Sequence, residues 1–365
     1  MYLALIIFSI LSYLAFQNKT SKSSIKKYII VMTILLIVIS SLRHEAVGND
    51  TYAYMRFFDQ YAEMSWSEVF DNFWTSYLYP GEDGKDPGQL VIIKALSYVV
   101  PNSRVFLCVV AALLLIPLGV LVYRNSKTLE TPCFFYVFYI TMFYPYLPNS
   151  AVRQSLALTI LLIGFLSLQK GKMLRFMMLL FVATFVHKSI VIAALIIPFY
   201  YLKNIKASYR LSLLLFIIML FTYKYVGVFM SMQSEIYEAY GSGEYYATAQ
   251  SVPFMVILMI LGLYVIGWIG IGKDKESYNK RLIYGGAAMT LVWVVMVRLD
   301  PSVIRLTAYF GPWMGLMVPD ALRLSSRRDF NILFAILLLV FIARAIMTPD
   351  NYHFLWQEMA LHDRY

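Results

Sequence analysis

The stretch SRVFLCVVAALLLIPLGVLVY at residues 103–123 indicates the fold class. It holds 21 residues with one charge, Arg104, and is therefore long enough to cross a bilayer as an α-helix. The composition of the chain agrees, since 60% of its 365 residues are hydrophobic and 14% are charged, against about 25% charged residues in soluble domains. The sequence predicts an all-α, polytopic integral membrane protein.

Similar apolar runs recur on both sides of this stretch, separated by short polar loops. About twelve transmembrane helices are predicted, at 1–16, 27–42, 103–123, 132–147, 151–168, 173–187, 189–202, 211–226, 252–271, 282–298, 302–320 and 330–347. Several runs are shorter than 20 residues, and the pair 173–187 and 189–202 fits the pattern least well. We expect a single transmembrane domain over residues 1–365.

The basic residues predict the orientation of the helices. Every second loop is basic, and these loops hold 19 of the 31 Lys and Arg residues. They are Lys19, Lys22, Lys26, Lys27, Arg124, Lys127, Lys170, Lys172, Arg175, Lys203, Lys206, Arg210, Lys273, Lys275, Lys280, Arg281, Arg323, Arg327 and Arg328. The positive-inside rule places these loops in the cytoplasm and both termini outside. This distribution also argues against nucleic acid as the partner of a chain with net charge +10.

The loop 43–89 is then predicted to face outside, with three basic and nine acidic residues. Its segment 51–79 mixes aromatic and acidic residues, which predicts amphipathic helices on the outer interface. Segment 89–100 is too short to span and is expected to be re-entrant or interfacial. The tail 350–365 is expected to form another interfacial helix.

Arg43 follows the second predicted helix at its outer end. A cation there complements the helix dipole or anchors the helix at the interface, and it can also bind an anion. Asp50 comes shortly after, where it or Asn49 fits the N-cap of a helix that begins near Thr51. The alternative role for Asp50 is to orient Arg43 or an acceptor hydroxyl.

Arg153 stands at the start of a predicted helix. Ser150 is expected to cap that helix, which places Arg153 in the first turn, where the dipole disfavours a cation. The positive charge is explained if an anion binds there. The alternative is an ordinary surface arginine.

Arg305 repeats this pattern near the end of the chain. Asp300 fits an N-cap and Pro301 the first helical position, while Arg298 ends the previous helix and Tyr309 lies about one turn deeper than Arg305. The alternative is an ion pair of Asp300 with Arg298 or Arg305 that only stabilises the turn.

His187 lies between the predicted helices 173–187 and 189–202, also at the outer side. A lone histidine is often only a satisfied polar residue. An imidazole that exchanges protons near neutral pH can instead serve as a general base or bind phosphate. Together with the arginines at 43, 153 and 305 it forms a one-sided ring of cationic groups, which suits a lipid-linked diphosphate.

No metal or cofactor site is visible in the sequence. There is no HExxH motif, no Cys/His cluster, no P-loop and no GxGxxG. Zinc, ATP and NAD enzymes are therefore disfavoured, and we expect no cofactor. Cys108 and Cys133 lie inside apolar stretches, where a disulfide is not expected.

Four blocks of residues, spread over most of the chain, carry a family resemblance. They are Leu42-Arg43 with residues 48–52 and Phe57-Phe58; Asp86-Pro87-Gly88; Asn149 to Gln154 followed by residues 185–189; and Arg305 with Tyr309-Phe310. In these blocks the chain resembles the EpsG-type branch of the bacterial Wzy-like polysaccharide polymerases. The family pattern at the second block is Glu-Pro-Gly, so Asp86 departs from it by one methylene group.

The resemblance implies a GT-C-like architecture in the bacterial cytoplasmic membrane. The implied reaction joins undecaprenyl-diphosphate-linked oligosaccharide repeats on the outer face, without a metal, and inverts the anomeric centre. The implied partners are the lipid-linked oligosaccharide, the lipid bilayer and a chain-length-regulating membrane protein.

The implied site combines phosphate-binding arginines with a base for the acceptor hydroxyl. The diphosphate-binding candidates are Arg43, Arg153, Arg305 and Arg298. The candidate base is His187, with Asp50 as the second choice. The candidates for binding the acceptor or glycan are Tyr52, Asp86 and Tyr309.

Two other functions share the anionic, lipid-linked substrate. A glycan ligase would use the same cationic site with a different acceptor, and the sequence does not separate it from a polymerase. A lipid-linked oligosaccharide flippase would line a central cavity with charges at several depths, whereas the candidate charges lie at one face.

Two functions with other substrates fit less well. A membrane O-acyltransferase would place its histidine nearer the cytoplasm than His187 is expected to lie. A purely structural scaffold protein would give no reason for Arg153 at the start of a helix.

Overall fold

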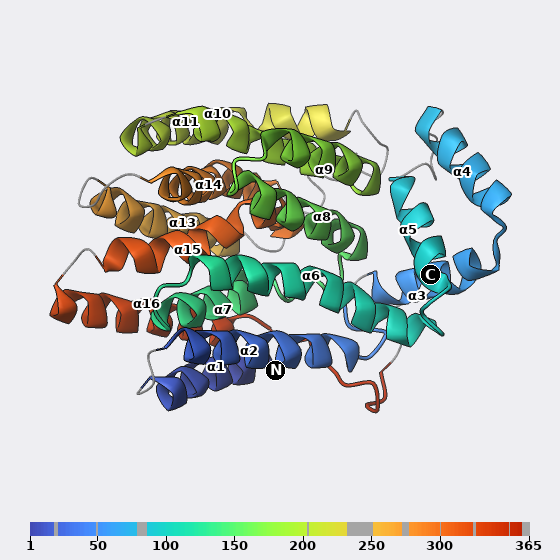
Figure 1. The fold of residues 1–365 in the computed structure, drawn as a ribbon, viewed down its shortest axis with the longest axis horizontal. Coiled ribbons are helices and arrows are strands. Elements are labelled where there is room, and N and C mark those ends of the chain that lie inside the picture. Colours follow the sequence, from blue (N-terminus) through green and yellow to red (C-terminus); the bar gives the residue numbers. More distant parts are fainter. Residues whose placement is uncertain are drawn as a thin grey trace. The chain divides into compact units, whose positions relative to one another are not determined.

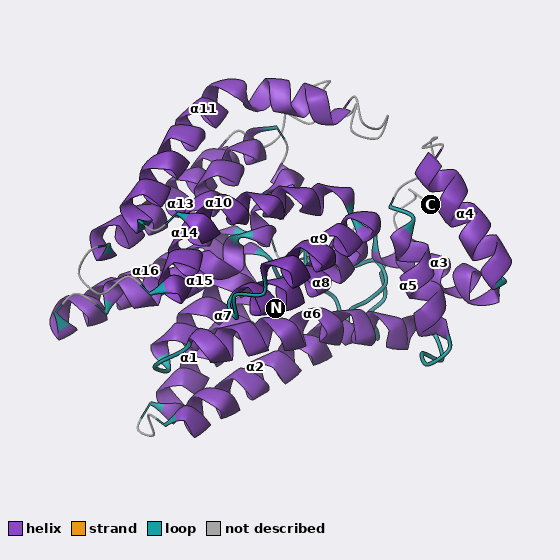
Figure 2. Cartoon of the chain, turned by 45° about the horizontal axis from the view of Figure 1, so that its top comes forward, coloured by secondary structure: helices purple, strands orange, loops and turns teal. Residues whose placement is uncertain are grey.

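The computed structural model describes residues 1–17, 21–48, 50–78, 86–202, 204–231, 251–271, 277–299, 301–323, 326–349 and 351–359. Within these ranges the chain is helical, without a named strand (Figure 2), which confirms the predicted all-α class. Five described helical segments are long and apolar enough to cross a membrane. They are α2 (Lys22–Ser41), α6 (Ser103–Asn125), most of α11 (Ile205–Ser231), α14 with η4 (Tyr278–Val294 and Val295–Arg298) and α16 (Arg327–Met347).

The remaining described helices are not among these five. They are α1 (Tyr2–Phe16), α3 (Thr51–Glu63), α4 (Trp66–Leu78), α5 (Gly88–Ser97), α7 (Glu130–Met142), α8 (Val152–Leu168), α9 (Met173–Val186), α10 (Ile196–Tyr201), α13 (Ser251–Gly270), α15 (Gly311–Leu322) and the 3₁₀ helices η1 (Lys188–Leu195) and η5 (Pro301–Tyr309). The expected amphipathic segment 51–79 therefore holds α3 and α4, and segment 89–100 holds the ten-residue α5.

The chain divides into two compact units. Unit 1 contains Met1–Val191 and Leu338–Tyr365, and unit 2 contains Ile192–Leu337. The single transmembrane domain expected over residues 1–365 stays a prediction, because one membrane domain can contain two compact units.

Unit 1 is built on a row of packed helices. α2, α6, α8 and α9 contact one another in that order, and α1 packs on α7 (Figure 1). The helices α3, α4 and α5 gather at one end of this row, where α3 contacts α6 and α5 contacts α9. That end positions the candidate site.

Unit 2 surrounds α14. This helix contacts α10, α11, α13, α15 and η5, and almost all of it is buried. Two adjacent glycines permit the close packing, since a Cβ at Gly285 would lie 2.7 Å from the Cβ of Phe199, and one at Gly286 would lie 2.4 Å from a ring carbon of Trp313.

Two predicted helices are wrong as continuous elements. Segment 302–320 consists of the 3₁₀ helix η5 followed by α15, and segment 189–202 consists of η1 followed by α10. In each case the second helix carries a proline in its first turn, Pro312 in α15 and Pro198 in α10. Proline lacks an N–H and clashes with the preceding turn, so it favours a helix start over a helix interior.

The predicted interfacial helix at 350–365 is also wrong where the tail is described. Residues 351–359 are not helical. Phe354 instead forms an antiparallel bridge with Arg43, and the Leu355 N–H donates to the carbonyl of Leu42 over 2.8 Å. A short extended pairing satisfies backbone groups that a helix would otherwise pair internally.

We predict that Gly286→Ala lowers the stability of the protein. Its methyl group would overlap the buried Trp313 ring, and overpacking of this kind costs about 1–3 kcal/mol. The measurement is the midpoint of thermal unfolding in detergent. Gly262→Ala in α13 is the matched control, since a Cβ there meets no atom within 4 Å. Equal midpoints for the two variants would contradict this account of the unit 2 core.

Candidate functional site

The carboxylate of Asp86 joins three segments of unit 1 that are distant in sequence. His187 Nδ1 lies 2.9 Å from Asp86 Oδ2, and Arg153 Nη1 lies 3.4 Å from the same oxygen. The backbone N–H of Lys188 donates to Asp86 Oδ1 over 3.0 Å. We call Asp86, His187, Arg153 and the Tyr54 side chain described below the Asp86 cluster.

The local backbone holds Asp86 in place. Asp86 has a φ of +50°, the left-handed region that Asp tolerates better than most residues. The Gln89 N–H donates to the Asp86 carbonyl over 3.1 Å as α5 begins. A Cβ at Gly88 would lie 2.8 Å from the backbone carbonyl of Phe185. The Asp-Pro-Gly turn therefore packs directly on the segment that precedes His187.

His187 follows the last residue of α9 with an extended backbone. Its side chain is 18% exposed and its Nδ1 faces the carboxylate. We assign the proton to Nδ1, which donates to Asp86 and leaves Nε2 as an acceptor. An imidazole held in this tautomer is suited to remove a proton from a neighbouring hydroxyl.

Arg153 lies in the first turn of α8, as expected, but its surroundings differ from the expectation. α8 begins at Val152 with Ala151 as N-cap and no capping side chain, so the predicted Ser150 cap is wrong. The anion beside Arg153 is a side chain of the same protein, since Asp86 forms an ion pair with it. The Arg153 side chain is 26% exposed, so part of it reaches the surroundings.

Tyr54 is a member of the cluster that the sequence prediction missed. Arg153 Nε donates to the Tyr54 hydroxyl over 2.9 Å. Burial raises the pKa of Tyr54, and the Arg153 charge opposes that shift. The signal was available, because Thr51, Tyr54 and Phe58 form the buried face of α3 at helical spacing. The predicted Tyr52 lies on another face, beneath the guanidinium of Arg56 at 6.0 Å.

The pKa of Asp86 is lowered below its ordinary value of 3.8. Burial alone would raise it, but the hydrogen bond and charge of His187, the charge of Arg153 and the Lys188 N–H outweigh burial. The carboxylate is therefore ionised at neutral pH and orients the His187 imidazole and the Arg153 guanidinium.

Arg43 is fully buried rather than anchored at the surface. Its guanidinium donates to the Ser40 carbonyl, to Ser40 Oγ over 3.0 Å and to Thr51 Oγ1 over 3.4 Å. Burial lowers its pKa to about 10. Thr51 Oγ1 also lies 2.7 Å from the Asn149 carbonyl oxygen, which links Arg43 to the segment before α8.

Asp50 is the N-cap residue of α3 by position, but its side chain makes no capping hydrogen bond. Among the described contacts, none joins Asp50 to Arg43. The alternative cap, Asn49, lies outside the described residues.

The other predicted site residues belong to unit 2. Arg298 is exposed and its guanidinium lies 4.6 Å from the centre of the Tyr223 ring. Arg305 lies within η5 and Tyr309, the last residue of η5, is fully buried. The predicted cap Asp300 lies outside the described residues. Whether these residues act together with the Asp86 cluster stays a prediction.

The described part of the chain contains no group of three His, Cys, Asp or Glu side chains placed to hold a metal ion. The Asp86 cluster offers one carboxylate and one imidazole, with a guanidinium at 3.4 Å from the carboxylate. The chemistry it can perform is proton removal by an oriented histidine beside a cation that can bind an anion.

The comparisons with known proteins return one family. The model of the EpsG family matches residues 26–355, which include every predicted site residue. No curated protein and no solved structure gives a significant match. The family resemblance expected from the sequence is confirmed.

We predict that Asp86→Asn destabilises the protein at neutral pH and has little effect in strong acid. A carboxyl whose pKa is lowered on folding stabilises the folded state above pH 3.8, and this contribution disappears as the pH falls through the lowered value. Loss of hydrogen bonds to charged groups should cost about 1.5–3 kcal/mol at pH 7. Thermal unfolding at pH 7 and at a pH below the lowered pKa of Asp86 measures both conditions.

The matched control is Asp59→Asn, since Asp59 is exposed on α3. It should leave the unfolding midpoint unchanged at both pH values. A destabilisation by Asp86→Asn that is as large in strong acid as at pH 7 would show that the ionised cluster is not its source.

Proposed function

Because the chain belongs to the EpsG family, we propose that it is a glycosyltransferase that polymerises oligosaccharide repeats linked through a diphosphate to undecaprenol. The family and the apolar helices indicate a polysaccharide polymerase-like membrane protein. The observation that carries the more specific reaction is the Asp86 cluster, in which one carboxylate orients a histidine and an arginine.

In the proposed reaction His187 Nε2 accepts the proton of an acceptor hydroxyl. The oxygen attacks the anomeric carbon of the donor, and a new C–O bond forms as the bond from that carbon to the diphosphate oxygen breaks. The bonding electron pair leaves with the diphosphate, and the anomeric centre inverts. The imidazolium that results is stabilised by the Asp86 carboxylate 2.9 Å away.

Arg153 is proposed to bind the diphosphate and stabilise its increasing negative charge. Its guanidinium is held by Asp86 and Tyr54, so little reorganisation is needed when the substrate arrives. Asp86 was expected to bind the acceptor or glycan, but its contacts support an orienting role instead. Tyr52, Tyr309, Arg43, Arg298, Arg305 and Asp50 keep their predicted roles as proposals that need separate tests.

We propose twelve passes through the bacterial cytoplasmic membrane in a GT-C-like arrangement, with the Asp86 cluster at the outer face. The passes at 189–202 and 302–320 would then be broken helices. Non-helical backbone at membrane depth is tolerated where protein buries it, and most described side chains of η5 are buried.

We predict that cysteines at two exposed positions of unit 1 report opposite sides of the membrane. In a background without Cys108 and Cys133, Asn72→Cys on α4 should react with an impermeant maleimide in intact cells. Lys170→Cys, in the turn after α8, should react only after permeabilisation. Labelling of Lys170→Cys in intact cells would overturn the proposed sidedness.

For the reaction itself, we predict that Arg153→Ala lowers polymer formation from purified lipid-linked repeats about 100- to 1,000-fold, as expected when a preorganised charged donor is lost. Arg153→Lys should be nearly as impaired, because lysine lacks the planar fork that binds phosphate oxygens. His187→Ala and Asp86→Asn should lower kcat more than they weaken donor binding. The measurement is the kinetics of polymer growth with folding matched by thermal unfolding.

Arg175→Ala is the control, since Arg175 is exposed near the start of α9, at the opposite end from His187. It should keep wild-type activity. Full activity in both Arg153→Ala and His187→Ala would place the reaction elsewhere in the chain. Transfer of single repeats to a different acceptor, without growth of the polymer, would support a ligase instead.

A further inference from the structure

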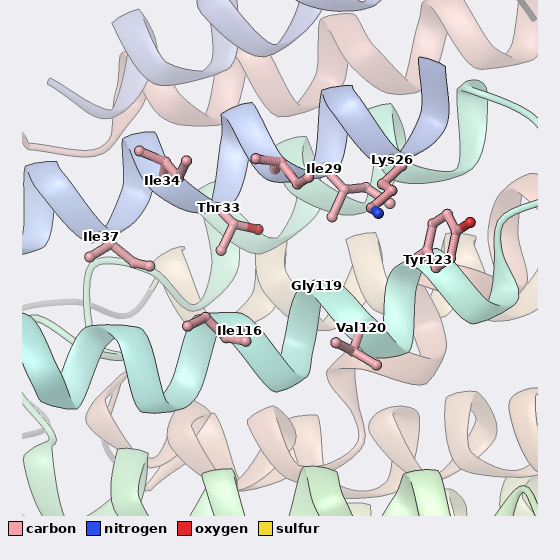
Figure 3. A pocket seen from close by; sticks show the side chains of 10 residues that line it. Lys26, Ile29, Thr33, Ile34, Ile37, Ile116, Gly119, Val120 and Tyr123 are labelled. Atoms are coloured by element: carbon pink, nitrogen blue, oxygen red, sulfur yellow. The ribbon is translucent and has the colours of Figure 1, made fainter. Parts of the chain in front are cut away.

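A groove of about 310 Å³ runs between α2 and α6 in unit 1, away from the Asp86 cluster. Figure 3 shows Lys26 and Tyr123 at one end of it and Ile37 and Ile116 at the other. The two helices are therefore antiparallel along the groove, with the start of α2 beside the end of α6.

The absence of a side chain at Gly119 opens the groove. A Cβ at this position would lie 2.9 Å from Thr33 Oγ1 and 3.3 Å from Ile29 Cγ2, so a larger side chain here would crowd α2. The Thr33 hydroxyl lies 2.8 Å from the Tyr136 hydroxyl and is satisfied by that contact. The floor of the groove therefore presents hydrocarbon rather than free polar groups.

The opening and the length of the groove suit one acyl chain. Ile34 and Ile116 are 55% and 53% exposed, so the groove opens toward the surroundings. From Lys26 to Ile37 the groove follows eleven helical rises of α2, or about 17 Å at 1.5 Å per residue. That length is close to half of the roughly 30 Å hydrocarbon core, which is the depth of one leaflet.

The open end beside Lys26 is strongly basic. Lys22 and Lys26 are four residues apart and share a face of α2. The described residues at the start of α2, at the end of α6 and from there to the start of α7 include five exposed cations and one part-buried acid, which are Lys22, Lys26, Lys27, Arg124, Lys127 and Glu130. A purely apolar partner, such as a protein helix or a second copy of this surface, would leave the Lys26 charge uncompensated. An anionic headgroup would neutralise it.

We propose that this groove binds an anionic membrane phospholipid, with one acyl chain between α2 and α6 and the phosphate beside Lys26. Arg43 follows the other end of α2, about 25 Å from Lys26 along the helix at 1.5 Å per residue. The lipid therefore belongs to the leaflet opposite the Asp86 cluster. The inference does not rest on the proposed polymerase reaction.

Native mass spectrometry of the full-length protein in detergent tests the proposal. Phosphatidylglycerol and phosphatidylcholine with identical acyl chains are titrated separately, and wild type should bind phosphatidylglycerol more tightly. Lys26→Gln should weaken phosphatidylglycerol binding about fivefold, the effect of removing one cation near a lipid headgroup, and should leave phosphatidylcholine unchanged. Val120→Trp should fill the groove and weaken both lipids.

Two controls make the result specific. Lys170→Gln removes an exposed cation outside the groove and should bind phosphatidylglycerol like wild type. Undecaprenyl diphosphate, added as a competitor, should not displace the bound phospholipid. Thermal unfolding and size-exclusion chromatography confirm that each variant is folded.

Wild-type phosphatidylglycerol affinity in Lys26→Gln, or in Val120→Trp, would overturn the proposal. Displacement of phosphatidylglycerol by undecaprenyl diphosphate would show that the groove serves the polyprenyl donor and would equally overturn it. A lipid-free dimer that Val120→Trp converts to monomer would assign the groove to a second copy of the chain. Activity is not a readout here, so failure of the polymerase proposal leaves this test intact.

Discussion

The buried negative charge of Asp86 is the constraint on which the candidate site depends. The carboxylate is 8% exposed, so water cannot compensate it, and an uncompensated buried charge is strongly unfavourable. The chain compensates it with a guanidinium, an imidazole and a backbone N–H from residues 67 to 102 positions away. These contacts also hold Asp86 in its left-handed backbone conformation. The start of α8, the end of α9 and the turn before α5 are thereby fixed to one another.

Helix α3 connects this cluster to the buried guanidinium of Arg43. Its buried face carries Thr51 beside Arg43 and Tyr54 beside Arg153, one helical turn apart. The two arginines nevertheless differ in what they can bind. Arg43 is 0% exposed and donates to groups of its own chain, whereas the Arg153 side chain is 26% exposed. Only the latter can reach an external phosphate without a rearrangement, so the proposed phosphate contact of Arg43 would require one.

The helical fold could be predicted from the sequence because a single apolar segment, such as Ser103–Asn125, is enough to indicate a membrane-spanning helix. Hydropathy does not register helix breaks, so the 3₁₀ helix η5 was hidden inside an apolar run, although Pro312 was a visible signal. The candidate residues Asp86, Arg153 and His187 were each identified from local motifs. Their mutual contacts were not predicted, because no periodic pattern links residues about 100 positions apart. Tyr54 was missed although its helical spacing with Thr51 and Phe58 indicated a buried face of α3.

The pairing of the C-terminal segment with the residues around Arg43 has a consequence for biosynthesis. The Tyr352 hydroxyl donates to the Ile39 carbonyl, and the His44 N–H donates to the His353 carbonyl. Unit 1 is therefore discontinuous in the chain, and all of unit 2 lies between its two parts. During vectorial synthesis the ribosome must complete unit 2 before these last contacts of unit 1 can form. The first helices therefore remain incompletely packed in the bilayer until almost the entire polypeptide has been translated.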